Sequence, residues 1–533
     1  MLVHAAVAEA LRGLGVDTVF GLMGDGNMHT LVDFVTSGGR YVGSVHEAGA
    51  VSMADGYARV GGRLGVASIT HGPGVSNALT ALTEAVRARS PLLVLTGDTP
   101  ARPDHLQRLD LRAAAGLTGA SYHRVLRPSD AVGDLVAAAR SALATGRPVL
   151  FDVPVDLQKA DFDAPVTVRP LPARQAVEPD PDALDRALGA IVSARRPVIV
   201  AGRGAAGARM ELVELADLIG APLGTTLLGK DLFRGHPLDL GVIGTLSTAI
   251  TTETVLAADC VIVFGAGLNR YTTAEGSLLD GKAVVRIDVD PAHPDSVVGD
   301  AAATARAMAT QLREVGYRFP ASRTSALSTL ATALSSHSPR EEFADRSGSG
   351  TIDARTAVIR LDELLPEERV VVTDTGRFVY APWRYLHVPE PSAFAHTLNF
   401  AAIGLGLATA IGAAAASPDR LTVAVIGDGG GMMGITELIT ASHAGLPLLV
   451  VVCNDGAYGM EYRGLELAGC DTAPSLLAWP DLADVARPLG ADAVTVRDLA
   501  ELEEAVASLK LPLARPMVLE LKNDPAVDVG DFA

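Results

Sequence analysis

The stretch Gly427–Glu461 reads GDGGGMMGITELITASHAGLPLLVVVCNDGAYGME, and it decides the fold that the sequence predicts. An apolar run delivers the chain to Gly427-Asp428-Gly429, a tight turn in which glycine lets the backbone approach a phosphate. A helical pattern over 435–444 follows, and then a second apolar run that ends at Asn454-Asp455. This order of strand, helix and strand predicts neighbouring parallel strands, with their carboxyl ends at one edge of a sheet.

Two carboxylates stand at these predicted strand ends. Asp428 follows the first strand and Asp455 follows the second, so we expect both side chains at the same edge of the sheet. Mg²⁺ prefers carboxylates, phosphate oxygens and water as ligands. A lone GDG is more often a structural turn, but an Asn-Asp pair at this distance makes the pattern far more specific. The stretch therefore predicts a magnesium and phosphate site.

Outward from this stretch, short apolar runs alternate with longer helical patterns along the whole chain. Examples of the runs are Leu92–Gly97, Pro197–Gly202, Cys260–Gly265, Thr422–Gly429 and Leu448–Asp455. Such alternation predicts an α/β fold of parallel sheets covered on both faces. A proline-rich linker at Asp161–Pro181 and a polar, glycine-rich one at Ser335–Gly350 divide the chain. We expect three doubly wound domains, at about 1–165, 180–330 and 350–533.

Composition excludes several classes of protein. The chain has 533 residues and a formal net charge of −18, which disfavours nucleic-acid binding. No apolar run approaches the roughly 18 residues of a membrane span, and the N-terminus lacks the basic start and continuous apolar core of a signal peptide. The three cysteines, Cys260, Cys453 and Cys470, match neither a zinc site nor a disulfide framework. We expect a cytoplasmic protein with reduced thiols and no membrane partner.

Several further motifs accompany GDG and Asn-Asp in a fixed order. They are VFGLMGDGN (19–27), HEAGAVSMADGYAR (46–59), THGPGVSN (70–77), TDTGRF (373–378) and IGLGLATAIGA (403–413). With them the whole chain resembles the thiamin-diphosphate-dependent enzymes that include acetolactate synthases, pyruvate decarboxylases, benzoylformate decarboxylases and benzaldehyde lyases. The residues of these motifs are most similar to those of acetolactate synthase large subunits. The resemblance implies pyrimidine-binding, central and diphosphate-binding domains, and a homodimer or homotetramer with active sites at the subunit interface.

The resemblance also implies which residues bind the cofactor. Glu47 corresponds to the carboxylate that hydrogen-bonds the pyrimidine ring and activates the cofactor by general-base catalysis. Cofactor contacts are implied for Glu47, Pro73, Asn77, Gly376, Arg377, Ile403, Gly427, Asp428, Gly429, Gly430, Asp455, Tyr458, Gly459 and Met460. The implied Mg²⁺ ligands are Asp428, Asp455 and the backbone carbonyl of Ala457. Asp455 departs from the family pattern, in which Asn is usual, and adds a negative charge beside the diphosphate.

Four positions bear on the type of reaction. Asp25 and Glu461 match acidic residues of decarboxylases, and His71 replaces a serine that is common in synthases. Gln107 matches a glutamine of the synthases and could hold a carbonyl oxygen for ligation. Plainer interpretations stay open, because Asp25 could only cap its turn, His71 could be structural and Glu461 could point to solvent. The expected pocket therefore mixes decarboxylase and synthase features.

The expected function is decarboxylation of a 2-oxo acid, or carboligation to an acyloin or acetolactate-type product, with thiamin diphosphate and Mg²⁺. One alternative is a lyase or hydrolase that cleaves acyloins or diketones with the same cofactor. Another, from a different class, is a non-catalytic relative that only binds the cofactor, and the retained Glu47 argues against it. The segment Gly265–Thr273 lacks the run seen in FAD-bearing synthases, so we expect no FAD.

Overall fold

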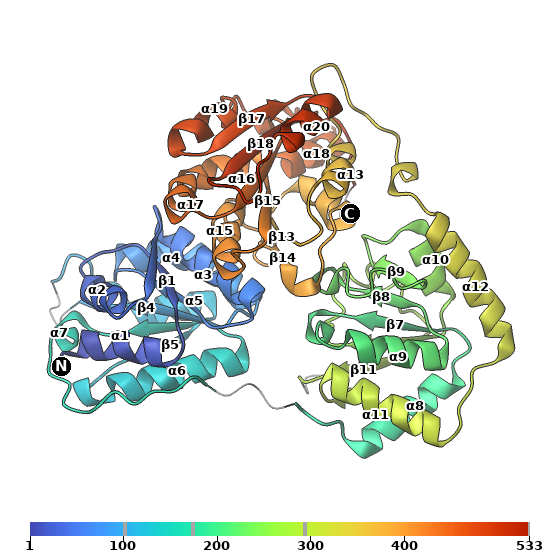
Figure 1. The fold of residues 1–533 in the computed structure, drawn as a ribbon, viewed down its shortest axis with the longest axis horizontal. Helices are drawn as coiled ribbons and strands as arrows, with labels where there is room; N and C mark the ends of the chain where they lie inside the picture. The colour runs from blue at the N-terminus through green and yellow to red at the C-terminus, as the bar shows by residue number, and fades with distance from the viewer. Residues whose placement is uncertain (100–103, 172–175, 291–295, 531–533) are drawn as a thin grey trace.

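A computed structural model describes residues 1–99, 104–171, 176–290 and 296–530. Three six-stranded parallel sheets, each formed by one part of the chain and surrounded by helices, make up the molecule (Figure 1). The α/β prediction with three doubly wound domains is therefore confirmed. The exact domain boundaries stay predictions. Within the described part of the chain, no helix combines the length and the apolar character needed to cross a membrane.

The first sheet has the strand order β2-β1-β3-β4-β6-β5. Its strands are β1 (Thr18–Gly21), β2 (Arg40–Gly43), β3 (Gly65–Ser68), β4 (Leu92–Thr96), β5 (Ser121–Arg124) and β6 (Val149–Asp152). The helices around it are α1 (Val3–Gly13), α2 (Met28–Thr36), α3 (Glu47–Gly61), α4 (Pro73–Arg87), α5 (Leu111–Thr118), α6 (Ala131–Thr145) and α7 (Val155–Gln158). All residues of β1, β3, β4 and β6 are buried, as expected for strands covered on both faces.

The last sheet has the order β14-β13-β15-β16-β18-β17. If β13 is counted as its first strand, this is the same order, 2-1-3-4-6-5, as in the first sheet. Its strands are β13 (Arg369–Thr373), β14 (Phe394–His396), β15 (Leu421–Gly427), β16 (Leu448–Asn454), β17 (Asp492–Val496) and β18 (Met517–Lys522). Its helices are α13 (Ala354–Leu364), α14 (Tyr380–Tyr385), α15 (Gly406–Ala416), α16 (Asp428–Gly434), α17 (Leu438–Ala444), α18 (Gly459–Leu467), α19 (Leu482–Ala486) and α20 (Leu499–Ala507). The chain thus uses one topology twice.

The central sheet differs, with the order β12-β11-β10-β7-β8-β9. Its strands are β7 (Pro197–Ala201), β8 (Leu223–Thr225), β9 (Asp239–Val242), β10 (Cys260–Phe264), β11 (Ala283–Asp288) and β12 (Val297–Val298). Its helices are α8 (Pro181–Ser193), α9 (Arg209–Ile219), α10 (Ala249–Ala257), α11 (Ala301–Glu314) and α12 (Ala321–Ser336). The order reverses between β7 and β10, which is where open α/β sheets form a crevice.

The stretch that predicted the fold, Gly427–Glu461, begins at the last residue of β15, forms α16, α17 and β16, and ends in the first turn of α18. In the register of β15 with β16, Gly427 lies opposite Cys453, so the two strands end side by side. The helical part begins at Asp428, earlier than the expected residue 435, and a single 3₁₀ turn at Ile435–Glu437 separates α16 from α17. Gly429, Gly430 and Gly431 are buried in α16, where the lack of side chains lets the helix lie close to its neighbours.

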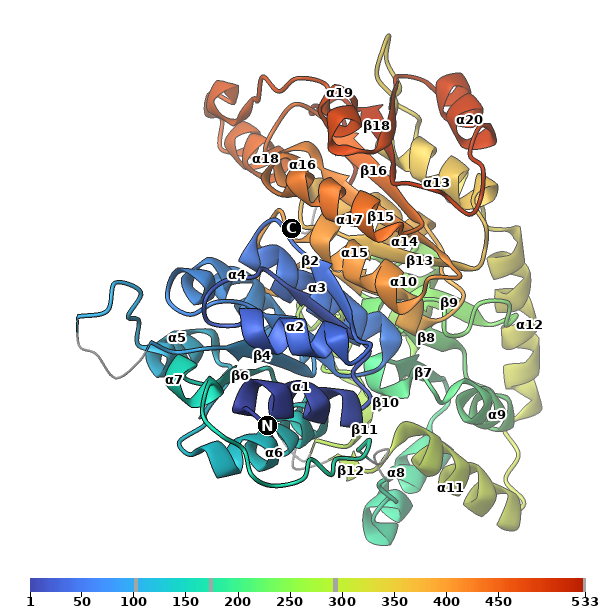
Figure 2. The ribbon, with the colours of Figure 1, turned by 60° about the vertical axis from the view of Figure 1, so that its left-hand side comes forward.

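The first and last domains meet through α3 and α15, whose ribbons run beside each other in both views (Figures 1 and 2). Glycine makes this contact close. A Cβ atom added to Gly56 of α3 would lie 1.9 Å from the carbonyl oxygen of Thr409, and one added to Gly412 of α15 would lie 1.8 Å from that of Met53. Side chains of both domains belong to one continuous apolar core.

We predict that Gly412→Ala destabilises the protein. The added methyl group would meet a backbone oxygen that cannot turn aside, so the two helices must separate, at a cost on the order of 3 kcal/mol. The midpoint of thermal unfolding, measured by calorimetry, should fall by several degrees. Gly189→Ala is the matched control, because Gly189 is an exposed residue of α8 with open space around its Cβ position. That substitution should stabilise the helix by about 0.5–1 kcal/mol, and equal midpoints for the two variants would contradict the proposed close contact.

Candidate functional site

A cavity of about 1310 Å³ lies between the central and last domains. Its wall on the last domain is formed at the carboxyl ends of β13, β15 and β16, where ligands bind in open α/β sheets. The candidate residues of the last segment all line it: Gly376, Arg377, Ile403, Gly427, Asp428, Gly429, Gly430, Asp455, Ala457, Tyr458, Gly459, Met460 and Glu461. The structure therefore brings together residues that lie up to 85 positions apart in sequence, from 376 to 461.

Asp428 and Asp455 stand at adjacent strand ends in this cavity. The Asp428 side chain is buried, and its Oδ2 atom has no hydrogen-bond partner among the described residues. The pKa of Asp428 is raised to about 7, mainly by burial and in addition by the negative charge of the neighbouring Asp455. Burial also raises the pKa of Asp455 to about 6. A buried carboxylate with an unused oxygen beside a half-buried one suits a bound cation, because a cation would compensate both charges.

The turn after β16 has a fixed shape. The Asp455 Oδ1 atom accepts a hydrogen bond from the backbone amide of Ala457 at 3.1 Å, and the Asn454 side chain accepts one from Gly456 at 3.0 Å. Asn454 also donates to Glu520 at 2.6 Å. No group of three His, Cys, Asp or Glu side chains surrounds one point in the described ranges. A Mg²⁺ ion held by Asp428, Asp455 and the Ala457 carbonyl would therefore take its other ligands from phosphate and water.

Glycines form the wall of the cavity beside these carboxylates. A Cβ atom at Gly429 would lie 2.8 Å from the Tyr458 ring, and one at Gly430 would lie 2.4 Å from Asp374 Oδ2, so neighbouring groups pack directly against the backbone there. Gly376 has a φ of 153°, which side-chain-bearing residues rarely adopt. A glycine-rich turn of this kind leaves backbone amides uncovered by side chains, as phosphate-binding turns do. The donor set and the glycine cradle fit a diphosphate with its cation.

Asp374 is a residue that the sequence analysis did not select. It lies at the end of β13, fully buried, and burial raises its pKa. Its carboxylate accepts hydrogen bonds from the amides of Gly404 at 2.8 Å and Gly406 at 3.2 Å. These contacts fix the loop that carries Ile403 and the start of α15. An acidic residue directly after a buried strand, within TDTGRF, was the available signal.

Glu47 belongs to a second cluster, in the first domain. It opens α3 and is 7% exposed, and the side-chain amide of Asn77 donates to its Oε2 atom at 3.0 Å. Asn77 stands on α4, which begins at Pro73, so THGPGVSN supplies the partner of the glutamate. The geometry leaves a buried carboxylate oriented by one neutral hydrogen bond.

Glu437 holds the start of α3 from the other domain, and sequence reasoning missed it. Its carboxylate accepts hydrogen bonds from the backbone amides of Val45 at 3.2 Å and His46 at 3.1 Å. Thr440 donates to the same carboxylate at 2.8 Å, and burial raises the pKa of Glu437. An acid placed inside the apolar sequence ITELIT was the signal. Glu437 therefore positions the helix turn that carries Glu47.

His71 lies in the same domain and is 1% exposed. Neither ring nitrogen has a hydrogen-bond partner in the described part of the chain, and its ring lies 5.9 Å from that of His105. Burial lowers the pKa of His71, and the nearby Gln107 and Asp25 side chains partly oppose the shift. Burial therefore favours the neutral form of the His71 ring. His105 was not selected from the sequence, because the sequence does not show that its ring lies beside that of His71.

Gln107 lies on a loop that contacts the turn after His71, whereas Asp25 is exposed. A Cβ atom at Gly72 would lie 2.3 Å from the Gln107 carbonyl oxygen, so the loop of Gln107 rests on the turn after His71. Asp25 is exposed, and so is Glu461 on the wall of the cavity. Asn27, rather than Asp25, makes the hydrogen bonds that close the 24–27 turn.

Among the described residues, those of the Glu47 cluster do not line the large cavity that holds Asp428. Among the described residues that line the large cavity, the first domain contributes Arg87 and Arg89 only. Glu47, Pro73, Asn77, Asp25, His71 and Gln107 lie outside that lining. One chain therefore presents two separate half-sites, one around Glu47 and one around Asp428.

Comparison with known proteins matches three family models to this chain. They are the N-terminal binding domain (residues 1–115), central domain (184–313) and C-terminal binding domain (374–521) of thiamine pyrophosphate enzymes.

Two curated relatives match nearly the whole chain. The chain is 30% identical to the acetolactate synthase large subunit of Parasynechococcus marenigrum, over 95% of this chain and 85% of the relative. It is 30% identical to a probable 2-ketoarginine decarboxylase of Pseudomonas aeruginosa, over 93% and 90%.

Among solved structures, the thiamine diphosphate-dependent 4-hydroxybenzoylformate decarboxylase of Rhodococcus jostii RHA1 has the same fold. The TM-score is 0.81 at 23% identity, covering 98% of this chain and 99% of that one. Three domain models in order, together with relatives that span almost the full length, place this chain in the family of thiamine pyrophosphate enzymes.

Proposed function

We propose that this protein decarboxylates a 2-oxo acid, or ligates the resulting fragment to a second carbonyl compound, with thiamin diphosphate and Mg²⁺. The observation that carries the proposal is Glu47, a buried carboxylate that Asn77 orients at the start of α3. A carboxylate in this position can hold the pyrimidine ring through a charge-assisted hydrogen bond. Burial strengthens that bond, because little water competes for it.

The cofactor would span the two half-sites. Asp428, Asp455 and the Ala457 carbonyl would hold Mg²⁺ and through it the diphosphate, while Ile403 would support the middle of the cofactor. When bound, thiamin diphosphate supplies a carbon nucleophile for the substrate carbonyl and accepts the electron pair that loss of CO₂ leaves behind. Glu47 and Asn77 would hold the pyrimidine end.

The chain's own side chains would manage the protons. Neutral His71 could accept a proton from a substrate oxygen, and the imidazolium so formed could return it, since neither ring nitrogen has a hydrogen-bond partner in the described structure. Gln107 can donate a hydrogen bond to a carbonyl oxygen. Asp25 and Glu461 would relay a proton from water to the reacting carbon when an aldehyde is the product, and this step would not occur when a second carbonyl compound captures that carbon.

Relatives support a 2-oxo acid as the substrate class. The names of two of them, 2-ketoarginine decarboxylase and 4-hydroxybenzoylformate decarboxylase, each specify a 2-oxo acid that loses CO₂. The name of a third specifies synthesis of acetolactate. Cleavage of acyloins or diketones is the competing reaction, and it would release no CO₂.

We further propose that a second copy of this chain completes each active site. Glu47 and Asp428 belong to separate half-sites in one chain, and Asp25 and Glu461 are exposed there. A two-fold dimer would bring the Glu47 half-site of one protomer to the Asp428 half-site of its partner, and would form two complete sites through one symmetric contact.

The reaction class can be tested with a panel of aliphatic, branched and aromatic 2-oxo acids. With thiamin diphosphate and Mg²⁺ present, at least one acid should yield CO₂ together with an aldehyde or an acyloin. Glu47→Gln should retain cofactor binding, measured by calorimetry, but lose roughly 10²–10⁴-fold in turnover, which is the usual contribution of acid–base catalysis.

The control for this experiment is Glu504→Gln, a change at an exposed residue of α20 that should leave turnover unaltered. Cleavage of acyloins without any release of CO₂ from the acids would favour the competing reaction. Full activity of Glu47→Gln would remove the basis of the proposal.

The shared site can be tested by mixing two inactive variants. Glu47→Gln and Asp428→Asn damage different half-sites, so a mixed dimer has one doubly damaged site and one intact site. Dissociating and reassociating an equal mixture should restore about a quarter of the wild-type activity, because half of the dimers are mixed and half of their sites are intact.

A mixture of Glu47→Gln with Glu47→Ala provides the control, since no intact site can form from it. If the Glu47→Gln and Asp428→Asn mixture exchanges subunits but stays inactive, both half-sites must come from the same chain.

A further inference from the structure

Glu520 is a fully buried carboxylate beside the turn of Asn454 and Asp455. It lies on β18, and in the register of β16 with β18 it pairs with Val452. Side chains two residues apart on a strand share one face of the sheet, so Asn454 lies next to Glu520 on that face. The side-chain amide of Asn454 donates to the Oε1 atom of Glu520 at 2.6 Å. The buried carboxylate therefore contacts the residue directly before Asp455.

Asn454 connects Glu520 to the shape of the turn. Its Oδ1 atom accepts a hydrogen bond from the backbone amide of Gly456 at 3.0 Å, and Asp455 Oδ1 accepts one from Ala457 at 3.1 Å. A side-chain amide carries its donor and its acceptor at opposite ends, and an ionised carboxylate can only accept. Glu520 therefore decides which end of Asn454 faces Gly456, and so supports the turn that presents Asp455 and the Ala457 carbonyl.

Hydrogen bonds and a counter-charge hold Glu520 in its ionised form. Its Oε2 atom accepts a hydrogen bond from the backbone amide of Ala483 at 3.0 Å. The Lys522 ammonium group lies 2.8 Å from its Oε1 atom and 2.7 Å from Asp481. A buried carboxylate that is paired and hydrogen-bonded in this way keeps its charge. Glu520 is thus an acceptor for the Asn454 amide and not a donor.

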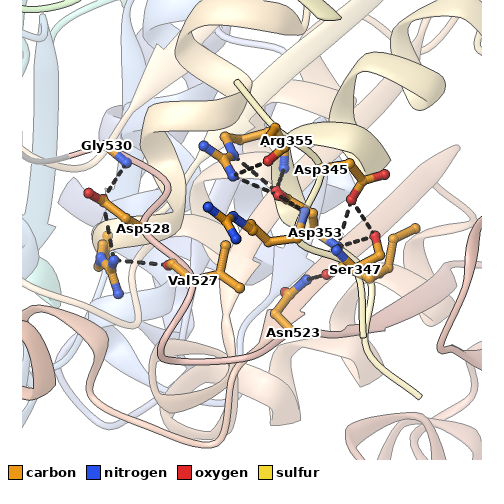
Figure 3. Close-up of polar contacts among 12 residues, drawn as sticks. Asp345, Ser347, Asp353, Arg355, Asn523, Val527, Asp528 and Gly530 are labelled. Atoms are coloured by element: carbon orange, nitrogen blue, oxygen red, sulfur yellow. Dashed lines mark hydrogen bonds and ion pairs between the residues drawn. The ribbon is translucent and has the colours of Figure 1, made fainter. Parts of the chain in front are cut away.

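The chain beyond β18 is anchored, which fixes the strand that carries Glu520. The side chain of Asn523 donates to the carbonyl oxygen of Ile352 at 2.7 Å. Arg377 donates to the carbonyl oxygens of Pro525 at 3.0 Å and Val527 at 2.9 Å. Figure 3 shows Asn523 and Val527 on this segment. The strand cannot slide along the sheet without breaking these bonds, so Glu520 is a fixed reference for the turn.

We propose that Glu520 positions the metal-binding turn, because it holds the Asn454 side chain with its oxygen toward Gly456. Glu520 is a positioning residue, since it acts on the turn through Asn454. The inference rests on the proposed function in so far as Asp455 and the Ala457 carbonyl hold Mg²⁺ in that turn.

An exchange of donor and acceptor between the two partners tests the proposal. The four proteins are the wild type, Asn454→Asp, Glu520→Gln and the double variant. In Asn454→Asp two carboxylates face each other, so residue 454 must turn away from residue 520. In the double variant the new amide at 520 can donate to the new carboxylate at 454, and its oxygen can still accept from Ala483. The double variant also has the net charge of the wild type.

Mn²⁺ is the probe, because it takes the same oxygen ligands as Mg²⁺ and its free form has a paramagnetic resonance signal that is lost on binding. With thiamin diphosphate at saturation, Asn454→Asp should weaken Mn²⁺ affinity by about tenfold or more, as loss of a partner that orients a metal ligand does. The double variant should return to within about threefold of the wild type. A double variant as weak as Asn454→Asp would overturn the proposal.

Glu520→Gln therefore weakens Mn²⁺ binding when residue 454 is asparagine and restores it when residue 454 is aspartate. A general loss of stability cannot produce this reversal of sign. Asp362→Asn is the matched control. The Asp362 carboxylate accepts hydrogen bonds from Arg369 and the His387 amide near the start of β13, at the opposite edge of the same sheet. Its loss should lower the midpoint of thermal unfolding and leave Mn²⁺ affinity unchanged.

Hydrogen exchange without ligand gives a readout that does not depend on the cofactor. The Gly456 amide should exchange roughly tenfold faster in Asn454→Asp than in the wild type, and at about the wild-type rate in the double variant. Equal rates in all four proteins would contradict the proposal. If the wild type takes up no Mn²⁺ with thiamin diphosphate, the proposed function fails, and these rates still decide whether Glu520 fixes the turn.

A second variant covers the case in which Asn454→Asp does not fold. Asn454→Ala then takes its place, and it should weaken Mn²⁺ affinity by about tenfold. Because Glu520 acts through Asn454, adding Glu520→Gln to Asn454→Ala should cause no further loss of Mn²⁺ affinity. A further loss of more than about threefold would show that Glu520 acts by another route and would refute the proposal.

Discussion

The register between β15 and β16 is the constraint on which the site depends. Gly427 pairs with Cys453, so Asp428 and Asp455 leave the sheet at adjacent positions. Parallel strands need a crossover, and the intervening helices supply it and return the chain to the sheet edge. Burial then makes the two carboxylates costly without a cation. A shift of this register by one residue would move Asp455 away from Asp428 and turn its side chain to the other face.

The glycine contact between α3 and α15 positions α3, the helix that begins with Glu47. Gly56 and Gly412 let the helix backbones approach so closely that no side chain fits between them. Glu437 then reaches across from the last domain and holds the amides at the start of α3, directly before Glu47. The position of Glu47 is thus fixed by two domains at once, which is the rigid support that its proposed catalytic role would need.

Sequence predicted the fold well, because strands such as β4 and β10 are largely apolar runs that a glycine directly follows. The sequence also predicted that Asp428 and Asp455 lie close together, because each follows one of two neighbouring strands. It missed Asp374 and Glu437, whose roles come from backbone amides far away in the chain, and such partners leave no local pattern. Arg377 shows the same limit, since its partners lie about 150 residues further on.

The separation of the half-sites has a further physical consequence. Each chain holds its own Glu47 and its own Asp428 at a distance set by the rigid contact of α3 with α15. In the proposed two-fold dimer, that internal distance would also fix how far apart the two complete sites lie, because each site would take one half from each chain. Loosening the glycine contact would therefore misplace both halves of both sites at once. A residue such as Gly412, remote from any reacting atom, would then control catalysis through geometry alone, since misplacement of about 1 Å can cost roughly 10²-fold in rate.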